Sequence, residues 1–374
     1  MKMFKLIFPI ILLVITQSTN AQQIVDSLLH NNAYRYYRLY VPPTNAGQNN
    51  LPLVFNLHGL TSNAAQQEFY SRMNEVADTS AFIVCYPDGL NNMWNSGFSP
   101  SGTDDVGFID VLIDELANKY NIDLNRVYSC GMSNGGYQSY YLACELPNRF
   151  AAIASVTGTM FPSVYSTCSP KRAMPVLQIH GTNDGTVLYE GSATATPIED
   201  VIAFWVANNL CTSAADTMAI ANIDTTDNST AQLISYENCD DNSAVHFYKI
   251  FNGEHTWPNA AIDLLGVTNQ DFNASEVIWN FFEPYNLESQ ILETTTNDLI
   301  EITVKPNPAH HFIGINGITK TSTIKIISVD GKLIKVFENV NSNTAINIAD
   351  LKAGLYFVNI FNDGKSVVAK LMVK

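Results

Sequence analysis

Short apolar runs separated by helical segments recur along most of this chain, and this alternation constrains its fold more than any other feature. The runs at residues 51–59 and 81–89 are almost continuously apolar, as strands buried on both faces of a sheet are. The other expected strands are an alternating edge strand at 34–42 and strands at 126–133, 150–158, 174–184 and 245–258.

Three segments between these strands have the apolar spacing of amphipathic helices. Residues 64–80 are expected to place Phe69, Met73 and Val76 on one side. Residues 105–120 repeat apolar side chains at four-residue steps, and the helix expected at 134–147 is stopped by a proline. Strands that alternate with helices predict an α/β fold, a mostly parallel sheet with helices on both faces.

The two ends of the chain differ from this body. Residues 1–21 combine two lysines with a short apolar run and end on small residues, a pattern that predicts a cleavable signal peptide. No other stretch is long and apolar enough to be expected to span a membrane. Residues 284–300 lack an apolar stripe and are interpreted as a linker, whereas 301–374 place Asp-Gly turns between β-rich runs. A main domain at 22–283 and a small all-β C-terminal module are therefore expected.

Charge is spread unevenly between these parts. Residues 22–299 contain 9 Lys and Arg against 30 Asp and Glu, a formal charge of −21, whereas residues 300–374 carry +4. An acidic body repels phosphate backbones, so nucleic acid is not an expected partner.

The sequence RVYSCGMSNGGY at 126–137 runs from a strand-like stretch into Ser133, which lies between Gly131 and Gly135. A nucleophile elbow, the tight strand-to-helix turn that exposes a reactive serine, needs small neighbours of this kind. Glycines around a serine also recur in ordinary loops, so the motif needs partners elsewhere in the chain.

A carboxylate and a histidine follow the serine in the order that this chemistry expects. Asp184 lies just past the buried part of the segment at 174–184, and His255 opens the loop after the last long strand. Both positions are at carboxyl ends of strands, where open α/β sheets bind their ligands. Serine, carboxylate and histidine in this order predict a Ser133–Asp184–His255 triad.

Other acidic residues and histidines are weaker candidates for the same roles. Asp224 and Asp227 lie in a polar, threonine-rich segment with no buried strand before it. His246 lies within an expected strand, His180 precedes the acidic loop, and His58 precedes the serine. His58 is better interpreted as an organiser of the loop beside the oxyanion hole.

Two backbone amides are expected to form that oxyanion hole. The N–H of Asn134 follows the nucleophile directly, and the N–H of Leu60 lies in the loop after the strand at 51–59.

Several ordered motifs together resemble a family of secreted esterases, the polyhydroxybutyrate-depolymerase-like and feruloyl esterases of carbohydrate esterase family 1. The motifs are RYYRLYVP, LPLVFNLHG, YPDG, MWNSG, DDVGFIDVLIDEL, DLNRVYSCGMSNGG, HGTND and HTWP, within residues 33–283. The resemblance implies an α/β-hydrolase with the triad above. It also suggests Trp94 and Trp257 as substrate-lining residues, with ordinary aromatic packing as the alternative. Leu60 stands where relatives often have cysteine or glycine, and Glu254 stands where glycine usually precedes the histidine; Glu254 is expected to alter the charge of the mouth.

Six cysteines in a chain with a predicted signal peptide raise the prospect of disulfides. Cys211 and Cys239 flank one polar stretch and Cys144 and Cys168 flank another, so these two pairs are expected to bond. Cys85 and Cys130 lie in strands that an α/β-hydrolase sheet separates by a third strand, and both are expected to remain buried thiols.

The C-terminal segment resembles the sorting domain of type IX secretion in Bacteroidetes. The resemblance rests on VKPNPAHHFIGINGI, IISVDGKLIKV, LKAGLYFVNI and VVAKLMVK. It implies the type IX secretion machinery as a partner, passage through the periplasm, and release or surface attachment with removal of the tail. A carbohydrate-binding module is the alternative, disfavoured because most aromatic residues of the segment fall in strand interiors.

These observations favour a secreted serine esterase that acts on acyl or feruloyl esters of plant polysaccharide. A polyester depolymerase for short 3-hydroxyalkanoates is the first alternative. A non-catalytic binding protein on the same fold is disfavoured, because all three triad residues are present. The sequence contains no phosphate loop or metal-ligand cluster, so no cofactor and no metal are expected.

Overall fold

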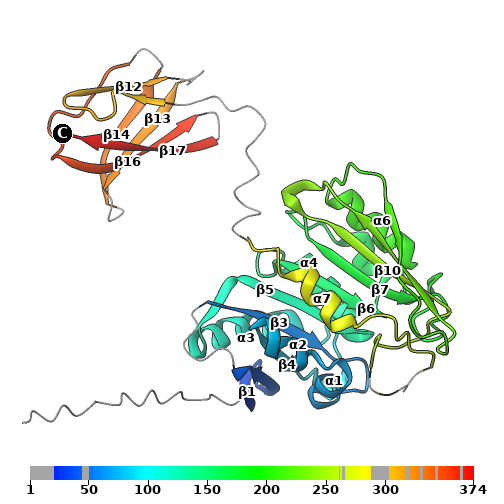
Figure 1. Ribbon diagram of the computed structural model, residues 1–374. Helices are drawn as coiled ribbons and strands as arrows, with labels where there is room; N and C mark the ends of the chain where they lie inside the picture. The colour runs from blue at the N-terminus through cyan, green and yellow to red at the C-terminus, as the bar shows by residue number, and fades with distance from the viewer. Residues whose placement is uncertain are drawn as a thin grey trace, which may run out of the picture. The chain divides into compact units, whose positions relative to one another are not determined.

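We analysed the protein in a computed structural model, which describes residues 21–43, 50–260, 262, 266–287, 303–316, 321–328, 332–341, 344–362 and 365–374. The chain forms two compact units, Met1–Glu293 and Thr294–Lys374 (Figure 1). Residues 1–20 of the expected signal peptide and residues 288–300 of the expected linker lie outside the described residues.

A ten-stranded mixed sheet forms the centre of the first unit, in the order β1-β2-β4-β3-β5-β6-β7-β10-β9-β8. The six strands from β4 to β10 in this order pair in parallel, and antiparallel strands flank them on both sides. This is the mostly parallel α/β sheet that the sequence predicts. The strands are β1 (Gln22–His30), β2 (Ala33–Val41), β3 (Leu51–Leu57), β4 (Ile83–Pro87), β5 (Ile122–Met132), β6 (Ala152–Val156), β7 (Val176–Gly181), β8 (Asp216–Ala219), β9 (Thr230–Tyr236) and β10 (Val245–Phe251).

Helices cover both faces of this sheet (Figure 1). Because side chains alternate along a strand, neighbouring residues enter different cores: Phe55 of β3 packs on one face and Val54 on the other. The first face is covered by α3 (Asp105–Lys119), α4 (Asn134–Glu145), α5 (Pro162–Thr167) and α6 (Ile198–Asn208), and the second by α1 (Ala64–Ser71), α2 (Met73–Ser80) and α7 (Ala274–Phe282).

Three details differ from the sequence-based expectations. The segment at 34–42 is not an edge strand, because β1 pairs with β2 along its whole length. The helix expected at 64–80 is two helices, since Arg72 adopts a left-handed φ of 53° between them. Phe69 does not share the buried side on which it was expected, because it is 60% exposed whereas Met73 and Val76 are buried. The exposed strand β8 and the mostly half-buried strand β9 were not expected either.

The second unit is built from antiparallel strands around one apolar core, which agrees with the all-β module expected from the sequence. Its two sheets have the orders β11-β12-β15 and β14-β13-β16-β17. The strands are β11 (Thr303–Lys305), β12 (Phe312–Asn316), β13 (Ser322–Ser328), β14 (Leu333–Val340), β15 (Ile346–Asn347), β16 (Gly354–Asn362) and β17 (Lys365–Val373).

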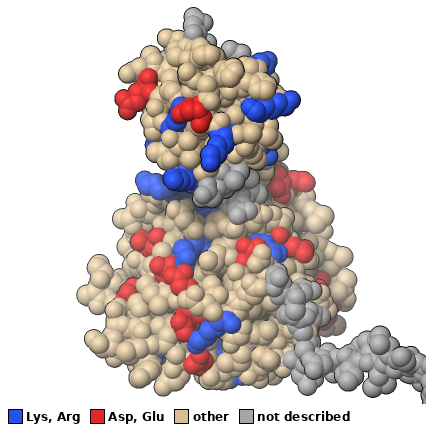
Figure 2. All heavy atoms as spheres, turned by 90° about the vertical axis from the view of Figure 1, so that its left-hand side faces the viewer, with Lys and Arg blue, Asp and Glu red and all other residues tan. Residues whose placement is uncertain are grey.

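Charged side chains on the face shown in Figure 2 are interspersed, so acidic and basic groups lie close to one another there. None of the helices in the described residues has the length and apolar character that a membrane crossing requires.

Both expected disulfides are present, Cys144–Cys168 and Cys211–Cys239. Cys85 and Cys130 are unpaired and buried, on strands β4 and β5 with β3 between them. Burial raises the pKa of both thiols, so neither is a reactive thiolate at neutral pH.

Loss of the Cys144–Cys168 disulfide is expected to destabilise the first unit. The bond closes a segment with a sequence separation of 24, and the chain-entropy model assigns about 3 kcal/mol to a loop of this size. Replacing both cysteines by alanine should therefore lower the urea midpoint of unfolding, and a reductant should shift the variant less than the wild type. An unchanged midpoint would contradict this expectation.

Candidate active site

Ser133 lies at a tight turn between the end of β5 and the start of α4. Its backbone has φ 54° and ψ −119°, a conformation that costs a residue with a side chain about 1–3 kcal/mol. Two hydrogen bonds hold it there: the Ser133 N–H donates to Val156 O at 2.8 Å, and the Tyr137 N–H donates to Ser133 O at 3.0 Å. The strained backbone at the end of a central strand has the form of a nucleophile elbow.

The glycines around Ser133 are required by close backbone packing. A Cβ atom at Gly135 would lie 2.1 Å from the carbonyl oxygen of Leu57, at the end of β3. A Cβ atom at Gly131 would lie 2.5 Å from the carbonyl carbon of Gly135. Both clashes involve backbone atoms, which cannot rotate away, so only glycine lets the turn approach the neighbouring strand.

Asp184 and His255 meet in the interior, although 71 residues separate them in the sequence. The His255 Nδ1 lies 2.8 Å from Asp184 Oδ2, and both side chains are almost fully buried. A carboxylate only accepts hydrogen bonds, so Nδ1 carries the proton of this contact and Nε2 of a neutral ring is left as a base. The backbone N–H groups of Thr186 and Val187 donate to Asp184 Oδ1 at 2.8 Å each, which fixes the carboxylate.

Ser133 and His255 both line one cavity of about 710 Å³. In this structure, which describes both side chains, no direct hydrogen bond joins the two residues. In free enzymes such contacts are often longer than hydrogen bonds and shorten when substrate binds. Both side chains therefore line one cavity, and a direct contact between them stays a prediction.

The two amides expected to stabilise an oxyanion lie beside this cavity. Leu60 is one of its lining residues, and Asn134 is the first residue of α4. In the described part of the chain neither N–H donates a hydrogen bond to a protein acceptor. The partial positive charge at the N-terminus of a helix makes the Asn134 amide a favourable site for negative charge.

The two tryptophans suggested as substrate-lining residues lie in the protein core. Each is 1% exposed, and neither lines the cavity, so the structure does not support a direct substrate contact for them. Trp94 donates its indole N–H to His58 O at 3.0 Å, and its backbone N–H donates to the Asn134 side chain. Trp94 thus supports the loops behind the elbow.

The alternative histidines have structural partners. His58 lies 2.7 Å from Gly59 O through Nδ1 and accepts from the Gly89 N–H through Nε2, as expected for a loop organiser. His246 contacts Glu237 at 2.6 Å, away from the cavity. His180 is fully buried, with Nε2 2.9 Å from Val187 O and 3.4 Å from Asp184 Oδ2. Its position behind Asp184 was not anticipated from the sequence.

The alternative acids and Glu254 hold loops together. Asp224 accepts from Thr226, and Asp227 accepts from the backbone N–H groups of Ser229 and Gln270. Glu254 accepts from the Val267 N–H at 2.7 Å and is not a lining residue of the cavity, so its expected effect on the charge of the mouth is not supported. Among the residues that the structure describes, no group of three His, Cys, Asp or Glu is arranged to hold a metal ion.

One wall of the cavity was missed in the sequence, namely α1, which contributes Ala65, Gln66, Phe69 and Tyr70. The sequence did contain a signal for this wall, because α1 directly follows the loop that carries Leu60, whose amide is expected to stabilise the oxyanion. The start of α1 was therefore to be expected near Ser133.

Comparison with known protein families gives two matches. Residues 35–241 match the family model described as esterase PHB depolymerase, and residues 303–374 match the secretion system C-terminal sorting domain. The first match covers more than half of the chain and includes Ser133 and Asp184, whereas His255 follows its end.

The individual relatives have low sequence identity to this chain. The bifunctional acetylxylan esterase/xylanase XynS20E of Neocallimastix patriciarum is 28% identical over 266 residues, covering 71% of this chain and 36% of that protein. Feruloyl esterase B of Piromyces equi is 31% identical over 169 residues, covering 44% of this chain and 32% of that protein. The chain thus spans about a third of the length of these relatives. The acetyl xylan esterase from Aspergillus awamori has a TM-score of 0.49 at 17% identity, covering 71% of this chain and 99% of that structure.

Replacing Gly135 by alanine is expected to destabilise the first unit by about 1–3 kcal/mol, because the added methyl group has no space beside Leu57 O. Gly185 is a matched control, since a Cβ atom there meets nothing within 4 Å. Gly185→Ala should leave stability unchanged or raise it by up to about 1 kcal/mol. Equal urea midpoints for the two variants would refute the packing argument.

Stability is also expected to fall as the pH is lowered below about 6.5, the ordinary pKa of histidine. Burial lowers the pKa of His58 and His180 in the folded protein. The unfolded chain therefore takes up protons that the folded protein does not, and each histidine removes at most about 1.4 kcal/mol per pH unit. Urea unfolding between pH 8 and pH 5 tests this; His58→Gln should weaken the dependence, and stability that increases toward pH 5 would contradict it.

Proposed function

Because this chain belongs to the esterase PHB depolymerase family, we propose that it is a carboxylic ester hydrolase with Ser133 as its nucleophile. The observation that carries the proposal is the buried 2.8 Å contact between Asp184 and His255, whose imidazole lines the same cavity as Ser133 at its strained turn. A neutral histidine held by a carboxylate beside a serine is the arrangement that activates a hydroxyl for acyl transfer.

In the proposed mechanism, His255 Nε2 takes the proton of the Ser133 hydroxyl as its oxygen attacks the ester carbonyl. Asp184 stabilises the imidazolium that forms. The N–H groups of Asn134 and Leu60 donate to the oxyanion, and His255 then gives its proton to the departing alkoxide. Water, activated by the same histidine, cleaves the acyl-enzyme and regenerates Ser133.

For the substrate we propose acyl or feruloyl esters carried on plant polysaccharide. The support is similarity to an acetylxylan esterase/xylanase and to a feruloyl esterase. A second candidate, hydrolysis of short 3-hydroxyalkanoate polyesters, is favoured by the description of the family itself.

For the second unit we propose recognition by the type IX secretion machinery, followed by release or surface attachment of the first unit. The support is the match of residues 303–374 to a secretion sorting domain. The two disulfides of the first unit agree with a location outside the cytoplasm. A mature extracellular form that still contains residues 301–374 would count against removal of the tail.

Ser133→Ala is expected to lower kcat by at least about a thousandfold, since removal of a catalytic serine leaves only the oxyanion hole and binding. Hydrolysis of p-nitrophenyl acetate measures this, with Ser166→Ala in the exposed helix α5 as the matched control. Retention of most activity in Ser133→Ala would end the proposed mechanism.

The substrate class is tested with the wild-type protein on methyl ferulate, acetylated xylan and hydroxybutyrate oligomers. A higher kcat/KM on either plant ester supports the first candidate. A higher value on the hydroxybutyrate oligomers would reverse the order of the two candidates.

A further inference from the structure

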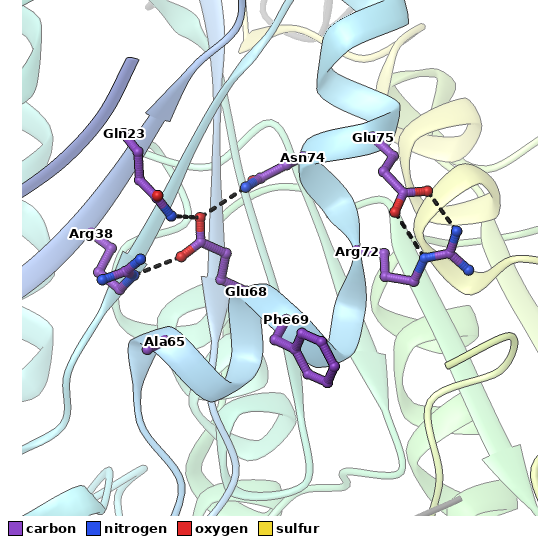
Figure 3. Close-up of a pocket in the computed structure, with 8 residues that line it drawn as sticks. All are labelled: Gln23, Arg38, Ala65, Glu68, Phe69, Arg72, Asn74 and Glu75. Atoms are coloured by element: carbon purple, nitrogen blue, oxygen red, sulfur yellow. Dashed lines mark hydrogen bonds and ion pairs between the residues drawn. The ribbon is translucent and has the colours of Figure 1, made fainter. Parts of the chain in front are cut away.

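A second hollow adjoins the catalytic cavity along helix α1. It encloses about 730 Å³ and shares two lining residues, Ala65 and Phe69, with the cavity that contains Ser133 and His255. We call it the Glu68 groove. Its remaining walls come from β1, β2, α1, α2 and the residue between the two helices (Figure 3): Gln23, Arg38, Glu68, Arg72, Asn74 and Glu75.

Internal ion pairs make the walls of this groove polar but almost neutral. Arg38 Nε lies 2.6 Å from Glu68 Oε2, and the Arg72 guanidinium forms two hydrogen bonds with Glu75, at 2.9 and 2.7 Å (Figure 3). Each cation is thus matched by a carboxylate. Such walls hold no excess positive charge for a phosphate or a polyanion, and they suit an uncharged ligand with many hydroxyl groups.

Glu68 also fixes the neutral groups of the groove. Gln23 Nε2 and Asn74 Nδ2 both donate to Glu68 Oε1, at 2.5 and 2.8 Å, which holds the two amides in place (Figure 3). In the part of the chain that the structure describes, the Gln23 amide oxygen and the two terminal guanidinium nitrogens of Arg38 have no protein hydrogen-bond partner. These groups can accept from and donate to the hydroxyls of a ligand.

Phe69 joins the two hollows and has an exposed aromatic ring. It lies on the last turn of α1 but is not among the buried residues of that helix, and 60% of its surface is accessible. An aromatic side chain in this position provides a flat apolar face between the site of ester cleavage and a polar groove. The apolar face of a sugar ring packs on such a surface while its hydroxyl groups remain free for hydrogen bonds.

We propose that the Glu68 groove is a subsite for the neutral sugar residues of a polysaccharide whose ester group enters the catalytic cavity, with Phe69 as the stacking surface. The proposal rests on the proposed esterase function and deepens it. It assigns the polymer-binding side of the enzyme to α1, and it predicts that neutral glycans are preferred over anionic ones.

The test compares two esters cleaved by the same Ser133. In Phe69→Ala the ratio of kcat/KM on acetylated xylan to kcat/KM on p-nitrophenyl acetate should fall about three- to tenfold, the loss expected for one aromatic contact. Phe69→Tyr keeps the ring and should restore the ratio. Phe312→Ala removes an exposed phenyl ring of similar accessibility from the second unit and should change neither activity. An unchanged ratio in Phe69→Ala would overturn the proposal.

A binding measurement separates this proposal from the esterase function. Calorimetric titration of Ser133→Ala with xylohexaose, which contains no ester, should show binding that weakens by a similar factor when Phe69→Ala is added. If xylohexaose does not bind although the wild-type protein hydrolyses p-nitrophenyl acetate, the assignment of the Glu68 groove as a glycan subsite is wrong. The proposed esterase function would not be affected by that result. If xylohexaose binds but the wild-type protein hydrolyses no ester, the proposed esterase function is wrong and the Glu68 groove remains a glycan-binding site.

Discussion

The approach of the first turn of α4 to the end of β3 is the contact on which the rest of this site depends. At Gly135 the two backbones are so close that a single methyl group would overlap Leu57 O. This contact sets the turn at Ser133 against the loop that begins after Leu57, and that loop carries the amide of Leu60. The proposed nucleophile and both proposed oxyanion donors are therefore positioned by main-chain packing.

The parallel strands β7 and β10 position the other two residues of the proposed triad, Asp184 and His255. β7 and β10 pair in register, with Gly181 opposite Ile250, so the loops that follow them leave the same edge of the sheet. Asp184 and His255 lie in those loops and meet there. This is why the sequence suggests Ser133, Asp184 and His255 as a triad, which stays a prediction: strand order and the carboxyl-end rule place the three residues at one edge without knowledge of any side-chain conformation.

The exposure of Phe69 and the burial of Trp94 could not be predicted from the apolar spacing of the sequence, and the physical reasons differ. Arg72 takes a left-handed conformation that its residue type does not predict, and Phe69 of α1 lies at the surface instead of on the expected core side. Trp94 lies near the active-site loops in sequence, yet its indole N–H is satisfied by a buried carbonyl and the ring is enclosed. Exposure depends on tertiary packing, which apolar spacing alone does not reveal.

Helix α1 borders both hollows, and its Phe69 lines each of them. Phe69 on α1 is 60% exposed, whereas Met73, the first residue of α2, is 1% exposed. Binding energy from a distant part of a substrate raises kcat only when it positions the reacting bond. A sugar held against α1, the helix that also forms the wall of the catalytic cavity, would orient the ester carbonyl toward Ser133, so polymer binding and catalysis would share one rigid element.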